Sequence, residues 1–174
     1  MPSKELIWIA EARKYIGEEE ISGPVTNPRL KHLFDLVDGL LDKKYLAGMD
    51  EDDIPWCAAF VSGILESVGI ESARSWWARS YRQWGRSLFG PVYGAVVVFE
   101  RGPTSGHVGF VVGKTDRSAY SPLWVLGGNQ SDAVNVKLFP RSRVLAYRYP
   151  DDVSLPNFLL PVFGQAEEFS EKEI

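Results

Sequence analysis

The chain holds a single cysteine, Cys57, in a sequence setting typical of a nucleophile. Pro55 suits the first helical position, because its ring fixes φ and its missing N–H is not needed there. Asp52 and Asp53 precede it as capping residues. A thiol in the first turn faces free backbone N–H groups and the positive end of the helix dipole, and both favour the thiolate. A lone cysteine is also often a small buried hydrophobe, so the prediction requires a base.

Two histidines are available as that base, His32 and His107. His32 lies beside Lys31, off the apolar face of its predicted helix, and we expect it to be solvated. His107 follows the Gly-rich turn 101–106, and Gly109 leaves further room beside the ring. A histidine at the start of a strand, between small neighbours, is unlike a core histidine in mid-strand. We therefore predict that His107 is the base that activates Cys57.

A third group is needed to orient the imidazole. Asn129 follows Gly127 and Gly128 at the end of a predicted strand, which places an amide at the mouth of a neighbouring hairpin. An amide oxygen that accepts a hydrogen bond from one ring nitrogen fixes the tautomer and leaves the other nitrogen for the sulfur. The alternative is that Asn129 only forms the turn, because Gly-Gly-Asn is ordinary turn chemistry.

The elements that position these residues separate into helices first and strands afterwards. Apolar spacing predicts helices over 3–16, 27–41 and 55–68, and a further short helix over 72–85. Runs rich in β-branched residues predict strands over 95–99, 107–112, 123–126, 134–138 and 144–149. The short loops between the strands favour antiparallel hairpins. The predicted fold class is α+β, with N-terminal helices packed on an antiparallel β-sheet.

The length of 174 residues suits one domain with one core. We predict a single catalytic domain over 1–164 and a flexible acidic tail over 165–174. The single cysteine excludes an intrachain disulfide. Residues 1–6 lack the basic start and apolar run of a signal peptide, and no stretch is long and apolar enough to span a membrane. We expect a monomer without an integral membrane segment.

Composition also excludes several classes of function. The net charge of −4 and the pI near 5.3 argue against a nucleic-acid partner. Four arginines at 74, 79, 82 and 86 are interpreted as a solvated face, with an anionic-ligand patch as the weaker alternative. The acidic run 50–53 lacks the spacing and the glycine of a calcium loop. Two histidines and one cysteine leave too few ligands for a zinc amidase. We expect no metal and no cofactor.

Several segments together resemble the CHAP and NlpC/P60 group of papain-like cysteine hydrolases, in particular the small single-domain members common in phages and prophages. These segments are Pro-Trp-Cys-Ala-Ala-Phe-Val at 55–61, the stretch from Ala-Val-Val-Val-Phe to Ser-Gly-His-Val-Gly-Phe at 95–110, and Val-Leu-Gly-Gly-Asn-Gln-Ser-Asp at 125–132. The likeness extends to 78–85 and 143–148. The resemblance implies a papain-like core, in which a helix with the nucleophile packs on an antiparallel sheet with the base.

The same resemblance implies hydrolysis of peptidoglycan, either at the amide between sugar and stem peptide or at a peptide bond. It implies that Cys57 is the nucleophile, His107 the general base and then the acid, and Asn129 the orienting residue. Gln130 is the second choice for orienting the ring. Peptidoglycan is then the substrate partner, and the role is that of an endolysin.

The chain departs from the wider family pattern at two places. Many relatives carry an acid two residues before the Asn, where this chain has Gly127. Relatives often supply a second oxyanion donor shortly before the cysteine, where this chain has acids and Tyr45 is the nearest candidate.

Trp56 and Trp77 are candidate substrate contacts, since an indole face stacks on sugar rings. The alternative for both is packing in the core or at its rim.

Two other functions remain open from the sequence. The same triad would serve a cysteine peptidase or acyltransferase that acts on protein. A wall-binding module of the same fold without catalysis is the non-enzyme alternative. We expect synthesis in the cytoplasm without a signal peptide, with access to the cell wall through holin release, phage delivery or a dedicated secretion system.

Overall fold

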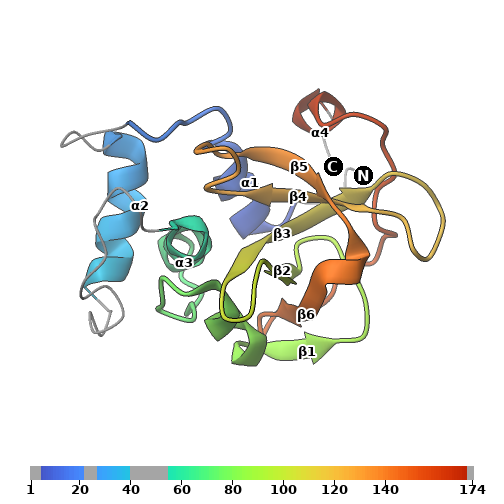
Figure 1. Ribbon diagram of the computed structural model, residues 1–174, viewed down its shortest axis with the longest axis horizontal. Coiled ribbons are helices and arrows are strands. Elements are labelled where there is room, and N and C mark those ends of the chain that lie inside the picture. Colours follow the sequence, from blue (N-terminus) through green and yellow to red (C-terminus); the bar gives the residue numbers. More distant parts are fainter. Residues whose placement is uncertain (1–4, 22–26, 40–54, 172–174) are drawn as a thin grey trace.

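The computed structural model describes residues 5–21, 27–39 and 55–171 (Figure 1). Three helices, α1 (Ile7–Arg13), α2 (Pro28–Asp38) and α3 (Cys57–Ser67), precede the sheet in the chain, and α3 packs directly on it. The α+β class with N-terminal helices on an antiparallel sheet is confirmed. Among the described helices, none has the length and apolar character needed to cross a bilayer.

The sheet has six antiparallel strands in the order β1-β6-β2-β3-β4-β5. The strands are β1 (Arg86–Leu88), β2 (Val96–Glu100), β3 (Gly106–Lys114), β4 (Leu123–Gly127), β5 (Asn135–Phe139) and β6 (Val144–Tyr149). The last five lie within two residues of the predicted strands. β1 lies just after the predicted helix over 72–85, of which only the 3-10 helix η3 (Ala78–Gln83) forms. A further 3-10 helix, η4 (Arg141–Arg143), precedes β6.

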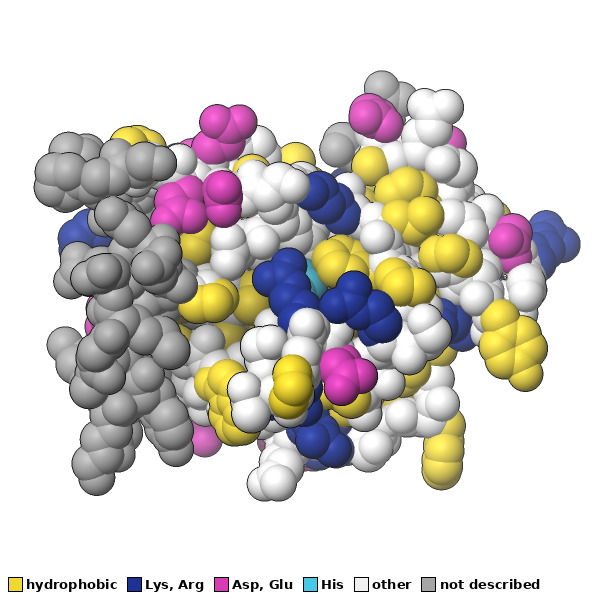
Figure 2. Space-filling model, in the orientation of Figure 1, with side chains coloured by type: hydrophobic (Ala, Val, Ile, Leu, Met, Phe, Trp, Pro, Cys, Tyr) yellow, Lys and Arg dark blue, Asp and Glu magenta, His cyan; other side chains and the backbone are white. Residues whose placement is uncertain are grey.

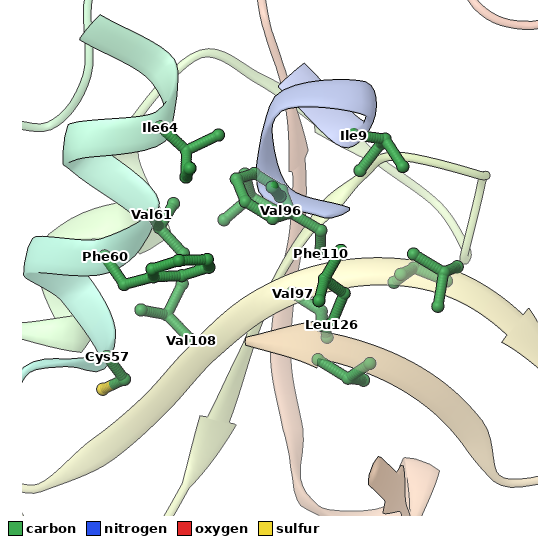
Figure 3. Packing of buried hydrophobic residues seen from close by; sticks show 14 of the residues in the cluster. Ile9, Cys57, Phe60, Val61, Ile64, Val96, Val97, Val108, Phe110 and Leu126 are labelled. Atoms are coloured by element: carbon green, nitrogen blue, oxygen red, sulfur yellow. The ribbon is translucent and has the colours of Figure 1, made fainter. Parts of the chain in front are cut away.

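Helix α3 is the centre of the core, because every residue from Cys57 to Leu65 is buried. Figure 3 shows Phe60, Val61 and Ile64 directed at apolar side chains of the sheet. Trp56 is the N-cap residue and Cys57 the first helical residue, so Pro55 precedes the helix by two positions. The predicted caps Asp52 and Asp53 lie outside the described residues.

The predicted tail over 165–174 is described by the structure as far as residue 171. Over the described residues it forms a short helix, α4 (Glu167–Glu171). Phe169 is 1% exposed, and the guanidinium carbon of Arg13 lies 3.7 Å from the centre of its ring. This one aromatic side chain ties the segment to the core, which the acidic composition around it does not reveal.

Helices α2 and α3 approach closely at Gly63. A Cβ there would lie 2.7 Å from the Cβ of Leu33 and 2.8 Å from its carbonyl oxygen. We predict that Gly63→Ala lowers the free energy of unfolding by about 2 kcal/mol, because the two helices would have to separate. Gly39→Ala is the matched control: its Cβ would meet its nearest atom at 4.0 Å, so we expect a change within about 0.5 kcal/mol. Equal effects in denaturant titrations would contradict the packing described.

Candidate active site

Cys57 lies at the N-terminal end of α3 with 1% of its surface exposed. The backbone N–H of Val108 in β3 is directed at its sulfur, as are the N–H groups of Ala58 and of Cys57 itself. Figure 3 shows Cys57 at the end of the helix, on the side of β3. The thiol therefore sits where the helix start meets the strand that carries His107.

His107 is the second residue of β3 and is fully buried. Its ring lies flat on Phe139, with the ring centres 5.0 Å apart, and is also stacked with Phe99 at 6.4 Å. The two phenylalanines come from the neighbouring strand β2 and from β5. They restrict the imidazole to one plane, so the direction of its two nitrogens depends on its hydrogen bonds.

Gln130 supplies the hydrogen bond that orients the imidazole. Its Oε1 lies 2.9 Å from Nε2 of His107. Its Nε2 donates to the carbonyl oxygens of Val125 at 3.2 Å and Asn135 at 2.8 Å, and to Oδ1 of Asn135 at 3.0 Å. These acceptors fix the amide with its oxygen toward the ring, so Nε2 of His107 must be the donor. Nδ1 is then unprotonated, and it has no hydrogen-bond partner in the described structure, the Cys57 sulfur included.

The structure brings Gln130, rather than Asn129, to the imidazole. Asn129 has a left-handed backbone, with φ at +54°, and is a half-buried turn residue. The second choice for orienting the ring is therefore the one that makes the contact, and the first matches the alternative of a turn residue. The sequence did not indicate a role for Asn135, which accepts hydrogen bonds from the Gln130 amide. Only the pairing of Gly127 with Asn135 across β4 and β5 brings it there, and nothing in the local sequence indicates that register.

Gly127 explains how Gln130 reaches the ring. A Cβ at position 127 would lie 2.7 Å from Oε1 of Gln130 and 3.6 Å from Nε2 of His107. Any side chain at this position would displace the Gln130 amide. The absence of an acid here, noted as a departure from the family pattern, leaves the space that the Gln130 side chain fills.

Burial sets the protonation of the pair. It raises the pKa of the Cys57 thiol, a rise opposed by the Val108 N–H, by the charge of Arg101 and by the N–H groups at the helix start. It also lowers the pKa of His107 to about 4, against the Gln130 hydrogen bond, which raises it. The predicted effect of the helix start on the thiol is present but is outweighed by desolvation. At neutral pH the resting pair is therefore a neutral thiol and a neutral imidazole.

Three cationic side chains lie around the histidine. The charges of Arg101, Arg143 and Lys137 each lower the pKa of His107 further. Arg143 donates to the carbonyl oxygen of Glu100 at 3.0 Å, and Lys137 donates to the Ser131 hydroxyl. None of the three forms an ion pair with the described acids. Figure 2 shows Lys and Arg side chains gathered near the middle of the face that it presents.

The two tryptophans predicted as substrate contacts differ in exposure. Trp56 is 3% exposed, donates from Nε1 to Glu20 at 2.9 Å and packs on Phe34. It is a buried residue without an exposed face, which matches the alternative of packing in the core. Trp77 is 46% exposed and keeps its face available. Tyr45, the candidate second oxyanion donor, lies outside the described residues.

No candidate metal site is present in the part of the chain that the structure describes. It contains no group of three or more His, Cys, Asp or Glu side chains placed to hold an ion.

The arrangement of Cys57 and His107 can transfer a proton from the thiol to Nδ1 as the sulfur attacks a carbonyl. That is the chemistry of amide hydrolysis through a thioester.

A cysteine at a helix start, packed on an antiparallel sheet with a histidine and an amide, is the papain-like arrangement. Residues 49–129 match the family model of the CHAP domain, a papain-like amidase family. The matched segment covers somewhat less than half of the chain, includes Cys57 and His107, and ends one residue before Gln130. A search of curated proteins found no match. Enzymes of the CHAP family are cysteine-dependent amidases or peptidases.

The low pKa of His107 makes stability depend on pH. The folded-state pKa of about 4 lies below the ordinary 6.5, so the unfolded chain takes up the proton first as pH falls, and stability is lost from pH 6.5 down to 4. Between pH 7 and pH 5 we predict that the wild type loses about 2 kcal/mol more than His107→Gln, which cannot titrate. Denaturant titrations at both pH values measure this difference. Parallel losses in the two proteins would contradict the buried neutral imidazole.

Proposed function

We propose that the protein is a peptidoglycan hydrolase that cleaves an amide bond through a thioester on Cys57, with His107 as base and Gln130 as the residue that orients it. The observation that carries this proposal is the imidazole itself: its Nε2 is held by Gln130, and its Nδ1 is left without a partner. The CHAP match over residues 49–129 supports the substrate class.

In the proposed mechanism, Nδ1 of His107 takes the thiol proton as the Cys57 sulfur attacks the carbonyl carbon. The protonated imidazole then gives that proton to the leaving amine as the C–N bond breaks, and a thioester remains. Water attacks the thioester while His107 accepts its proton, and the acid and the free thiol are released. The Cys57 N–H at the helix start is the proposed oxyanion donor, an interaction worth roughly 3 kcal/mol.

Burial of the thiol has a consequence for substrate access. A carbonyl carbon must come within about 3.5 Å of the sulfur, so groups that cover Cys57 must move when substrate binds. For the same reason, slow alkylation of Cys57 in the resting protein fits both an enzyme and a non-catalytic wall-binding module. Hydrolysis, rather than thiol reactivity, therefore has to separate these two functions.

The finer assignment, to the small lysins of phages and prophages, is part of the proposal. It is supported by the combined motifs at 55–61, 95–110 and 125–132. We propose in addition that the wall is reached after holin release, phage delivery or a dedicated secretion system.

Purified sacculi test the activity. We predict that the wild type releases soluble muropeptides, and that Cys57→Ala and Cys57→Ser abolish release because both lack the nucleophilic sulfur. Mass spectrometry of the products identifies whether the sugar–peptide amide or a peptide bond is cut. Cys57→Ser serves as the near-isosteric control for folding. Absence of release by the wild type, or undiminished release by Cys57→Ala, would refute the proposed function.

Gln130 and Asn129 can be compared directly. We predict that Gln130→Ala lowers kcat on sacculi by roughly a hundredfold, because the base loses the partner that fixes its tautomer. Asn129→Gly keeps the left-handed backbone of the turn and should cost less than about threefold. A larger loss in Asn129→Gly than in Gln130→Ala would reverse the assignment.

A further inference from the structure

A hollow of about 540 Å³ lies between η3 and the loop that leads into β3. It is lined by Trp77, Arg79, Arg82, Gln83, Pro103 and Thr104. In Figure 1 this is the region where the green η3 lies beside the β2–β3 hairpin. The triad does not use any of these residues.

Hydrogen bonds fix two walls of this pocket relative to each other. Trp77 donates from Nε1 to the carbonyl oxygen of Thr104 at 3.2 Å. Arg79 donates from Nε to the carbonyl oxygen of Ser105 at 3.0 Å, and from Nη2 to that of Gly102. The loop is therefore held against η3 while nearly half of the Trp77 surface stays exposed.

The lining combines one aromatic face with hydrogen-bond donors and has no carboxylate. Arg82 and Gln83 are both exposed, and Arg82 forms no ion pair with the described acids. An indole face packs on the C–H face of a sugar ring, and guanidinium and amide N–H groups donate to its hydroxyl and acetamido oxygens. This combination fits an N-acylated amino sugar better than an apolar ligand.

The pocket also lies next to the base. Gly106, the residue before His107, packs so closely on η3 that a Cβ there would lie 3.2 Å from Cγ of Arg79 and 3.6 Å from Cβ of Ala78. The η3 wall of the pocket therefore packs directly on the residue that precedes His107.

We propose that this pocket binds the amino-sugar strand of the wall polymer and so positions the attached peptide at Cys57. The proposal rests on the proposed function, whose substrate it specifies further. The stem peptide is the competing occupant, and the test is designed to separate the two.

The experiment measures binding by calorimetry in the Cys57→Ala protein, which leaves the ligand intact. The two probes are glycan strands stripped of their peptides and the stem peptides released from the same sacculi. We expect Trp77→Ala to weaken glycan binding roughly tenfold and Trp77→Phe, which keeps a ring, to weaken it about twofold. Arg82→Ala should weaken it as well. Phe89→Ala and Arg117→Ala, which remove an exposed ring and an exposed arginine outside the pocket, are the matched controls.

Three results would overturn the proposal: no glycan binding by the parent protein, equal binding by Trp77→Ala and Phe89→Ala, or a loss confined to the stem peptide. The outcome is independent of hydrolysis. If glycan binding depends on Trp77 but release from sacculi does not depend on Cys57, the proposed function is refuted and the assignment of the pocket stands. If release from sacculi depends on Cys57 but glycan binding does not depend on Trp77, the assignment of the pocket is refuted and the proposed function stands.

Discussion

The hydrogen bond between Nε2 of His107 and Oε1 of Gln130 is the interaction on which the site depends. A ring N–H without contact with water costs free energy unless it is paired, and Gln130 is the partner that the described structure provides. The Gln130 amide is held in turn by Val125 and Asn135, which belong to β4 and β5. The pairing of these two strands therefore determines which imidazole nitrogen is left to receive a proton.

Burial, more than the helix start, governs the chemistry of Cys57. A favourable helix dipole contributes about 0.3–1 kcal/mol, whereas burial of an ionisable group shifts a pKa by up to about 3–5 units. Desolvation thus prevails over the N–H groups at the start of α3, and the same effect keeps His107 neutral. At neutral pH the proton of the resting site is therefore on the sulfur. The cations at 101, 137 and 143 act in the same direction on the imidazole.

The sequence was sufficient for features with a local cause. Helical spacing around Cys57 and the strand that carries His107 follow from short patterns, and Asn27, directly before Pro28, caps α2. Features that depend on contacts between residues far apart in the sequence could not be predicted. Left-handed residues at 129, 131 and 132 form the turn in which Gln130, and not Asn129, faces the ring. Trp56 is buried by Phe34 and by the backbone at Gly128, and β1 forms only because β6 pairs with it.

The tautomer of His107 is the most direct test of this account. Only two histidines are present, and His32 is exposed, so a two-dimensional ¹H–¹⁵N spectrum of the imidazole groups at pH 7 resolves both rings. We predict that His107 carries its proton on Nε2 and that its Nδ1 is unprotonated. A proton on Nδ1, or an imidazolium with both nitrogens protonated, would contradict it.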